Sequence, residues 1–366
     1  MKNSIIYNPI FAFSISIVIF YLLPLVLYND GVYLESTRVS IYQILSIIFF
    51  FWFCFALPFL VHALVARTGG GSRISYFPVS RIFRYIFPLI CIFTSLVTVR
   101  EVSQASFYLC MVYGIYFSLL VLRRNLKIYE AVMFLIIIIL AIFSGDKSFI
   151  LMLVLPSFMT LVIKGRLVRG VLAGLSFVGV IFYTSAVIRG HHLMESGRAV
   201  IDLVFALIIG RLNMIEPFTR LLVNPDRFDA ISGLYVGNNT LFPNVLSGLI
   251  PRSVIDRVDV SPAQSVSRVY YSGDTNVTLS AFAETYGNFG FGGGAYYLFF
   301  GGVSYFLYSK FLRSHSRLMY YFYTFYILYA LYLHVERYQA LMFATLLKAL
   351  VVILFAVMMQ RVVLRV

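Results

Sequence analysis

The chain has 366 residues, of which 61% are hydrophobic and only 12% charged, and its formal net charge is +14 at pH 7. A soluble domain carries about 25% charged residues, so this composition excludes an ordinary water-soluble globule and predicts an integral membrane protein. The apolar runs reach about 20 residues, whereas the strands of a transmembrane barrel alternate apolar and polar residues over about 10 positions. The expected fold class is therefore all-α and polytopic.

The apolar runs predict about ten membrane-spanning helices. In chain order they are residues 10–28, 41–65, 82–99, 105–122, 128–144, 149–163, 168–188, 291–309, 318–333 and 338–359. The stretch 199–215 is also apolar, but a crossing there would invert every later span. We therefore expect it to lie on the membrane surface or dip into it as a helix that Pro217 ends or kinks.

Basic and acidic residues alternate between successive connections. The connections after the second, fourth, sixth and eighth spans carry no acid, and Glu130 is the one acid at an adjoining span end. Together with those span ends, the connections carry the following cations: Arg67, Arg73, Arg81, Arg84, Arg123, Arg124, Lys127, Lys164, Arg166, Arg169, Lys310, Arg313 and Arg317. The positive-inside rule places these connections and both termini in the cytoplasm. The excess of positive charge therefore reflects the orientation of the spans in a bacterial inner membrane, and it does not indicate nucleic-acid binding. Residues 1–366 form one transmembrane domain, with residues 189–290 as a large periplasmic loop containing surface or re-entrant helices.

Two arginines of this loop lie near the predicted membrane plane. Arg189 ends the seventh span and Arg211 stands in the apolar stretch. A guanidinium is costly there without an anionic partner, and its fork matches phosphate oxygens. Both are candidate ligands of a lipid diphosphate. The alternative is a surface of ion pairs within the loop, such as Glu216 with Arg220 at the i, i+4 spacing.

Two short external turns carry further candidates. Lys147 lies in the turn at 145–148. Its two alternative roles are an anchor at the membrane interface and a ligand of a diphosphate. His334, Glu336 and Arg337 form the turn between the last two spans. A histidine and a carboxylate at the membrane face can act as a base and its orienting partner; the alternative is a hydrated turn.

The segment 282–290 precedes the eighth span. Glu284 stands there among apolar and aromatic residues, where desolvation would suit it to proton transfer. The alternative is that it neutralises one of the loop arginines. Glycines follow closely and allow either close helix packing or a broken helix start: Gly287, Gly290, Gly292, Gly293 and Gly294. The cysteines, Cys54, Cys91 and Cys110, fall in apolar runs and are expected to be buried thiols.

Four segments carry a family resemblance. They are Ile188-Arg189-Gly190, Gly210-Arg211-Leu212-Asn213-Met214, Pro251-Arg252, and the Glu-x-Tyr-x-Asn-Phe-Gly pattern within 283–290. Over roughly residues 188–302, and in the layout of spans around one large loop, the chain resembles the Wzy family of O-antigen, or oligosaccharide repeat-unit, polymerases.

The resemblance implies an inverting glycosyltransferase that needs neither a metal nor a cofactor. It would transfer a glycan from undecaprenyl diphosphate to a new lipid-linked repeat unit in lipopolysaccharide or related surface polysaccharide biosynthesis. The implied catalytic residues are Glu284, His334 and Glu336, and the implied substrate-binding residues are Arg189, Arg211, Arg252, Lys147, Arg337, Asn288 and Tyr286. The implied partners are undecaprenyl-diphosphate-linked glycans, membrane lipid and a chain-length regulator protein, without nucleic acid.

Two other functions fit parts of the same pattern. An O-antigen ligase would use the same donor but transfer the glycan to lipid A–core. A lipid-linked oligosaccharide transporter would carry charges or broken helices near the bilayer midplane. The predicted spans are nearly free of charge, with Lys348 as the exception. The polymerase is therefore preferred.

Overall fold

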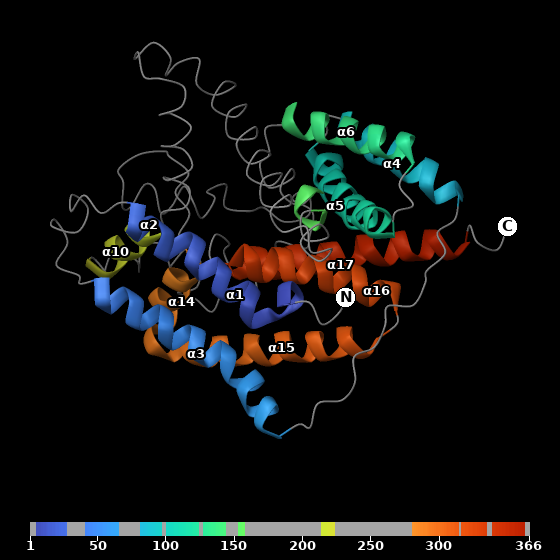
Figure 1. Ribbon diagram of the computed structural model, residues 1–366. Helices are drawn as coiled ribbons and strands as arrows, with labels where there is room; N and C mark the ends of the chain where they lie inside the picture. The colour runs from blue at the N-terminus through green and yellow to red at the C-terminus, as the bar shows by residue number, and fades with distance from the viewer. Residues whose placement is uncertain are drawn as a thin grey trace, which may run out of the picture.

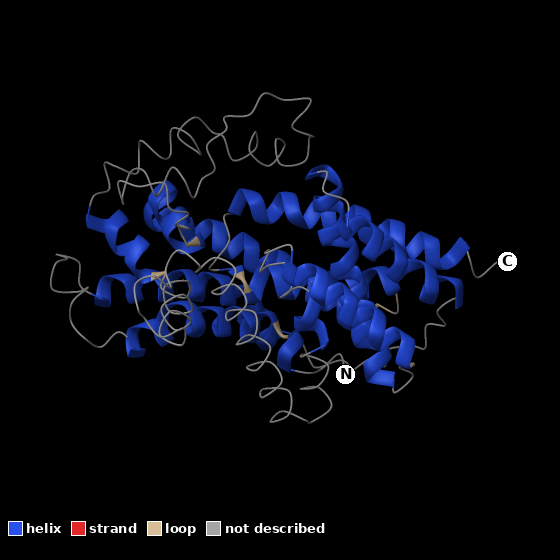
Figure 2. Cartoon of the chain, turned by 90° about the horizontal axis from the view of Figure 1, so that it is seen from above, coloured by secondary structure: helices blue, strands red, loops and turns tan. Residues whose placement is uncertain are grey.

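The computed structural model describes residues 5–27, 41–65, 81–96, 100–123, 127–143, 153–157, 214–223, 280–314, 316–334 and 339–362. Throughout these ranges the chain is helical and contains no strand (Figure 2). The all-α prediction is confirmed. The predicted spans at 149–163 and 168–188 and the surface helix at 199–215 fall largely or wholly outside the described ranges.

The helices follow the predicted apolar runs closely. Their bounds are η1 Ile5–Tyr7, α1 Pro9–Ile17, η2 Val18–Leu22, α2 Leu23–Leu27, α3 Ile41–Val65, α4 Arg81–Leu96, α5 Arg100–Arg123, α6 Ile128–Phe143, α10 Ile215–Val223, α14 Ala281–Phe289, η4 Gly290–Gly292, α15 Gly293–Arg313, α16 Arg317–Tyr326, η5 Ile327–Tyr332 and α17 Gln339–Val362 (Figure 1). Two of these, η2 and η5, are π-helical turns inside longer helices. Such turns are rare and often accompany functional sites.

The first helix begins where its sequence specifies. The Asn8 side chain accepts hydrogen bonds from the N–H groups of Ile10 at 2.9 Å and Phe11 at 3.4 Å. Pro9 occupies the first helical turn, where its missing N–H removes no helical hydrogen bond. Pro217 has a similar place in α10. It lies in the first turn of α10, which continues to Val223, whereas the surface helix that it was expected to end or kink falls outside the described residues.

Helices α3 and α15 form a parallel pair (Figure 1). Phe51 stacks on Tyr297 at a centroid distance of 4.9 Å, and further along Phe59 meets Tyr305 at 5.4 Å. Between them Gly301 faces the backbone of Phe55, so closely that a Cβ at this position would lie 2.1 Å from the Phe55 carbonyl oxygen. The absence of a side chain lets two aromatic-rich helices pack backbone to backbone.

Helix α16 returns antiparallel to α15. The Tyr326 and Ser304 hydroxyls are 2.5 Å apart, and Phe311 packs near Tyr320 at 6.2 Å. The N-terminal segment joins the same end, because the Tyr323 hydroxyl donates a hydrogen bond to the Tyr7 carbonyl at 2.7 Å. Aromatic residues thus supply both the bulk and the hydrogen-bonding groups of this part of the core.

Helices α4, α5 and α6 pack into a second group. Phe117 of α5 and Phe134 of α6 stack with centroids 3.8 Å apart, and Arg84 approaches Glu130 at 3.8 Å. Glu130 also accepts the backbone N–H of Lys127 at 2.9 Å, so the one acid at a basic connection has a capping role. Cys91 and Cys110 are buried free thiols, as expected, while Cys54 is partly exposed.

Apolar side chains also cover outward helix faces. On α17 they follow the i, i+4, i+7 spacing of a single face, at Leu347, Val351, Leu354 and Met358. Soluble proteins rarely expose contiguous apolar patches of this kind. Among the described helices, Tyr42–Ala63 is long and apolar enough to cross a membrane, whereas other apolar stretches are shorter, at Pro9–Leu25, Arg84–Leu96, Ser106–Val121, Ile128–Ala141 and Thr345–Met359.

Candidate functional site

A short helix, α14, enters the bundle at the end where α3 begins (Figure 1). Its N-cap is Ser280, whose hydroxyl oxygen accepts the N–H of Ala283 at 3.1 Å. The same oxygen accepts a hydrogen bond from the Tyr21 hydroxyl, which comes from the π-helical turn η2. Phe282, two residues after Ser280, is fully buried and packs against Phe13 at a ring centroid distance of 5.7 Å. The start of α14 is therefore anchored inside the core.

Glu284 is buried on this helix, with only 3% of its surface exposed. Its backbone N–H donates to the Ser280 carbonyl at 2.9 Å, which places the side chain close to the helix N-terminus. The partial positive charge of a helix N-terminus favours a carboxylate there. The expected burial of this carboxylate is observed. A buried carboxylate in such a setting is a strong candidate for a functional group.

Asn288 lies one helical turn beyond Glu284, on the same face of α14. Its Nδ2 donates to the Glu284 carbonyl at 2.8 Å. Its Oδ1 is buried and has no hydrogen-bond partner among the described residues. Buried acceptors of this kind are uncommon and call for a donor from water or a ligand. Within the described part of the chain, Asn288 thus has an unpaired acceptor one helical turn beyond Glu284.

The glycines separate α14 from α15, as expected for a broken helix start. Gly290 adopts φ +55, a left-handed conformation that favours glycine, and the short turn η4 follows. Gly293 and Gly294 then pack closely against their neighbours. A Cβ added at Gly293 would lie 2.6 Å from the Thr285 side chain, and a Cβ added at Gly294 would lie 2.8 Å from the Phe50 ring. The break lets α14 and α15 run at different angles while both contact α3.

His334 lies inside an aromatic enclosure and not in an exposed turn. Its ring centroid is 5.0 Å from those of Phe13 and Phe300. Nδ1 lies 3.1 Å from the Ala330 carbonyl oxygen, and Nε2 lies 3.2 Å from the Tyr297 hydroxyl. This pattern fits a neutral ring that donates from Nδ1 and accepts at Nε2.

The burial of His334 has an electrostatic consequence. Desolvation lowers the pKa of His334 to about 3, because a charged ring would be costly among aromatic side chains. The expectation that His334 lies in an exposed turn is wrong, because its side chain is buried and its Nδ1 bonds to the Ala330 carbonyl within the bundle. In this state His334 orients Tyr297 and is poorly placed to take a proton from a substrate.

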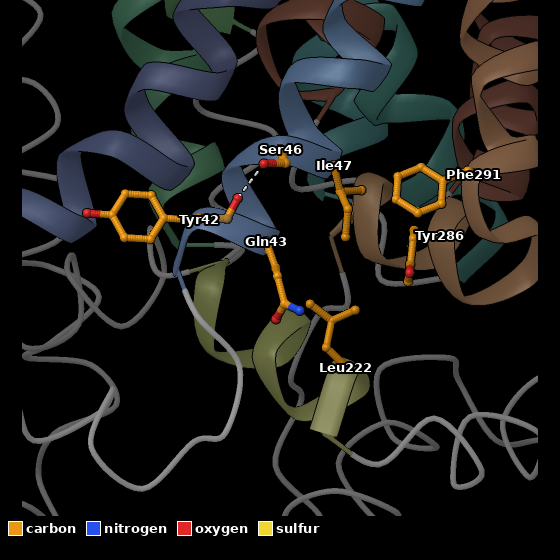
Figure 3. A pocket seen from close by; sticks show the side chains of 7 residues that line it. All are labelled: Tyr42, Gln43, Ser46, Ile47, Leu222, Tyr286 and Phe291. Carbon is orange, nitrogen blue, oxygen red and sulfur yellow. Dashed lines mark hydrogen bonds between the residues drawn. The ribbon is translucent and has the colours of Figure 1, made fainter.

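A pocket of about 440 Å³ opens beside α14, at the beginning of α3 (Figure 3). Tyr286 and Phe291 form one wall, with their rings perpendicular at a centroid distance of 5.6 Å. The Gln43 side chain extends toward Leu222 of α10. The remaining lining residues are Tyr42, Ser46 and Ile47. Tyr286, one of the predicted binding residues, thus lines this pocket.

Six of the predicted site residues lie outside the described residues. They are Lys147, Arg189, Arg211, Arg252, Glu336 and Arg337. Of the others, Glu284, Tyr286 and Asn288 lie on α14, where Glu284 and Asn288 share a face and Tyr286, two residues from each, does not. His334 lies outside this helix, with its ring centroid 6.1 Å from that of Phe282. Within the described part of the chain, no group of three or more histidine, cysteine, aspartate or glutamate side chains could hold a metal ion.

Sequence reasoning missed three residues of this region. Tyr21 and Tyr297 are hydroxyl-bearing residues within apolar runs, where nothing in the pattern distinguishes a hydrogen-bonding tyrosine from a packing one. Gln43 gave a usable signal, because an amide is unusual in the first turns of an apolar run.

No protein-family model matches the chain, and no curated protein and no solved structure is similar to it.

Proposed function

We propose that the chain is a multi-pass inner-membrane glycosyltransferase that polymerises lipid-linked oligosaccharide repeat units at the periplasmic face. The observation that carries the proposal is the buried carboxylate of Glu284, on a helix whose start is anchored inside an apolar bundle. In this proposal Glu284 is the proton acceptor for a hydroxyl-bearing substrate that enters from the end of the bundle.

The directions of the helices support a membrane topology of this kind. Alternating crossings require the second and eighth spans to run the same way, and α3 and α15 are parallel. The same scheme requires the ninth span to run opposite to the eighth, and α16 is antiparallel to α15. The exposed apolar faces of α4, α6 and α17 are suited to contact with lipid. Both termini would then lie in the cytoplasm.

The proposed reaction assigns a role to each group. The hydroxyl of an acceptor sugar attacks the anomeric carbon of the donor, and its proton passes to the Glu284 carboxylate. The bond between the anomeric carbon and the phosphate oxygen breaks, and undecaprenyl diphosphate leaves. Arg189, Arg211 and Arg252 would stabilise its charge in place of a metal ion. The glycosidic bond forms with inversion at the anomeric carbon.

The test uses the purified protein in lipid nanodiscs with a lipid-linked repeat unit, in the absence of ATP and divalent metal. We expect a ladder of products on a gel. Glu284→Gln should abolish the ladder, since loss of a general base lowers rates by about 10²–10⁴. Glu216→Gln is the matched control, because Glu216 is a partly exposed carboxylate paired with Arg220 at 2.9 Å on α10.

Other products would assign a different function. Transfer only to added lipid A–core would identify a ligase. Movement of the lipid-linked glycan across the bilayer without a new covalent product would identify a transporter. A full ladder from the Glu284→Gln variant would remove Glu284 from the mechanism.

A further inference from the structure

Helices α4 and α6 pack against each other, and the starts of the two helices lie together (Figure 1). Near these starts the rings of Tyr85 and Tyr129 stack at a centroid distance of 4.8 Å, with an angle of 17° between their planes. In the proposed topology this end of the two helices lies at the cytoplasmic face of the membrane. Tyrosine is enriched at the level of the lipid headgroups, so the stacked pair marks that depth.

Two cations lie at the same level as the stacked pair. Arg84 precedes Tyr85 on α4, and its side chain is 20% exposed and lies 3.8 Å from the Glu130 carboxylate. Within the described part of the chain this long ion pair is the one polar contact of Arg84, although a guanidinium has five N–H donors. Lys127, directly before α6, is exposed. Both side chains therefore have donors for an acceptor from outside the protein.

Glu130 leaves this end of the helices positively charged. Its carboxylate is 1% exposed and accepts the backbone N–H of Lys127 at 2.9 Å and the Tyr129 hydroxyl at 3.4 Å. This one buried carboxylate is close to two cations. The connections that lead into α4 and α6, residues 66–80 and 124–127, contain further arginines and no aspartate or glutamate. An anionic ligand is the charge complement of such a surface.

Each helix also presents an exposed apolar face beyond the cations. The exposed side chains recur at the i, i+3, i+7 spacing of a single helix face, and they include Ile86, Leu89 and Phe93 on α4 and Val132, Leu135 and Ile139 on α6. Acyl chains cover faces of this kind, whereas a free phosphate ion gains nothing from them. A ligand with an anionic head and apolar chains matches both parts of the surface.

We propose that an anionic phospholipid of the cytoplasmic leaflet binds at the starts of α4 and α6, with its phosphate held by Arg84 and Lys127. The proposal rests on the membrane topology of the proposed function and goes beyond it, because it names a lipid site on the face opposite the periplasmic one. The fork of the guanidinium fits two phosphate oxygens, and the ammonium adds a point charge. The bound lipid would fix the depth and orientation of this helix group in the bilayer.

The test localises lipid binding on the full-length protein in detergent micelles. The probe is a photoactivatable phosphatidylglycerol with its reactive group in an acyl chain, and peptide mapping measures the label on α4 and α6. Unlabelled dioleoyl-phosphatidylglycerol should compete with this label at about 25-fold lower concentration than dioleoyl-phosphatidylcholine, which has the same chains and no net charge. Arg84→Gln and Lys127→Gln should each reduce this preference about fivefold. Lys310→Gln is the matched control, because Lys310 is an exposed cation near the end of α15, on the same predicted face of the membrane.

Lys127→Gln keeps the test decisive where Arg84→Gln does not fold, since it removes an exposed ammonium and retains the backbone N–H that Glu130 accepts. Equal competition by the two lipids, or an unchanged preference in the folded Lys127→Gln protein, would overturn the proposal. Glycerol 3-phosphate has the phosphate without the chains, and competition by it at the concentration of the lipid would overturn the assignment to a phospholipid. A product ladder from a protein without lipid preference overturns this proposal and leaves the proposed function standing. Preference that depends on Lys127 supports the lipid site even where no ladder forms.

Discussion

The Tyr21 hydroxyl donates a hydrogen bond to the Ser280 hydroxyl oxygen, joining the first helix to the residue that begins α14. The two residues are far apart in sequence, yet both are fully buried. Ser280 in turn caps the helix that carries Glu284. The position of the candidate base therefore depends on a contact made by the π-helical turn η2.

Tyr21→Phe should loosen this connection without emptying the core. Loss of one buried hydrogen bond typically lowers the free energy of unfolding by about 1 kcal/mol. We expect a modest fall in the thermal midpoint and a larger fall in ladder formation, because the start of α14 would be less fixed. Tyr85→Phe is the control, since Tyr85 is 51% exposed and lies on α4, away from the pocket. A Tyr21→Phe protein with wild-type turnover would show that α14 needs no such anchor.

Gly301→Ala should be strongly destabilising. The added methyl carbon would lie 2.1 Å from the Phe55 carbonyl oxygen, so α3 and α15 would have to separate. Overpacking of this kind costs roughly 1–3 kcal/mol, and more where backbone must move. Gly302→Ala is a neighbouring control, because nothing lies within 4 Å of the Cβ position there. Thermal unfolding in detergent would compare the two, and equal midpoints would contradict the observed packing.

Acidification should destabilise the fold through His334. Burial lowers the pKa of His334 from 6.5 to about 3. Between pH 6.5 and pH 3 the imidazole therefore binds a proton in the unfolded chain but not in the folded chain. Stability from this group is complete above pH 6.5 and decreases as the pH falls toward 3. We expect His334→Gln, which cannot be protonated, to reduce the loss of stability between pH 7 and pH 4. Parallel pH profiles for the variant and the wild type would contradict a buried neutral imidazole.

The sequence was most informative where one physical rule dominates. The length of apolar runs located α3 at 41–65, and the glycine run indicated the break before α15. It was least informative for His334, where neighbouring Glu336 and Arg337 indicated an exposed turn. Burial there depends on Tyr297 and the end of η5, which are contacts between distant segments. Hydrophobic periodicity contains no information about such pairings.

Arginine dependence is a prediction from the sequence, because Arg211 and Arg252 lie outside the described residues. A departing diphosphate needs fixed positive charge, so Arg211→Ala and Arg252→Ala should each abolish chain extension while the protein still inserts. Lysine should restore little activity at either position, since it lacks the bidentate fork. Arg227→Ala, in the same segment, is the control. Wild-type ladders from both alanine variants would refute this role.

Asn288 offers a way to separate substrate binding from structure. Its Nδ2 bond to the Glu284 carbonyl contributes to the helix, whereas its Oδ1 has no partner among the described residues. We propose that a sugar hydroxyl donates to this oxygen. Asn288→Ala should then raise the KM for the acceptor about tenfold, equivalent to one hydrogen bond of about 1.4 kcal/mol, and lower the thermal midpoint only slightly. Steady-state kinetics with varied acceptor concentration would measure the effect.

Asn288→Asp completes this test, because it keeps an acceptor oxygen at the same place but adds a negative charge near Glu284. Two neighbouring carboxylates disfavour each other's ionised form, so the pH optimum of the Asn288→Asp variant should shift upward while acceptor binding is partly retained. A purely structural Asn288 predicts the opposite pattern for Asn288→Ala. In that case the free energy of unfolding of Asn288→Ala would fall by the contribution of the Nδ2 hydrogen bond, and its KM would stay at the wild-type value. Asn288→Asp would show an unchanged pH profile.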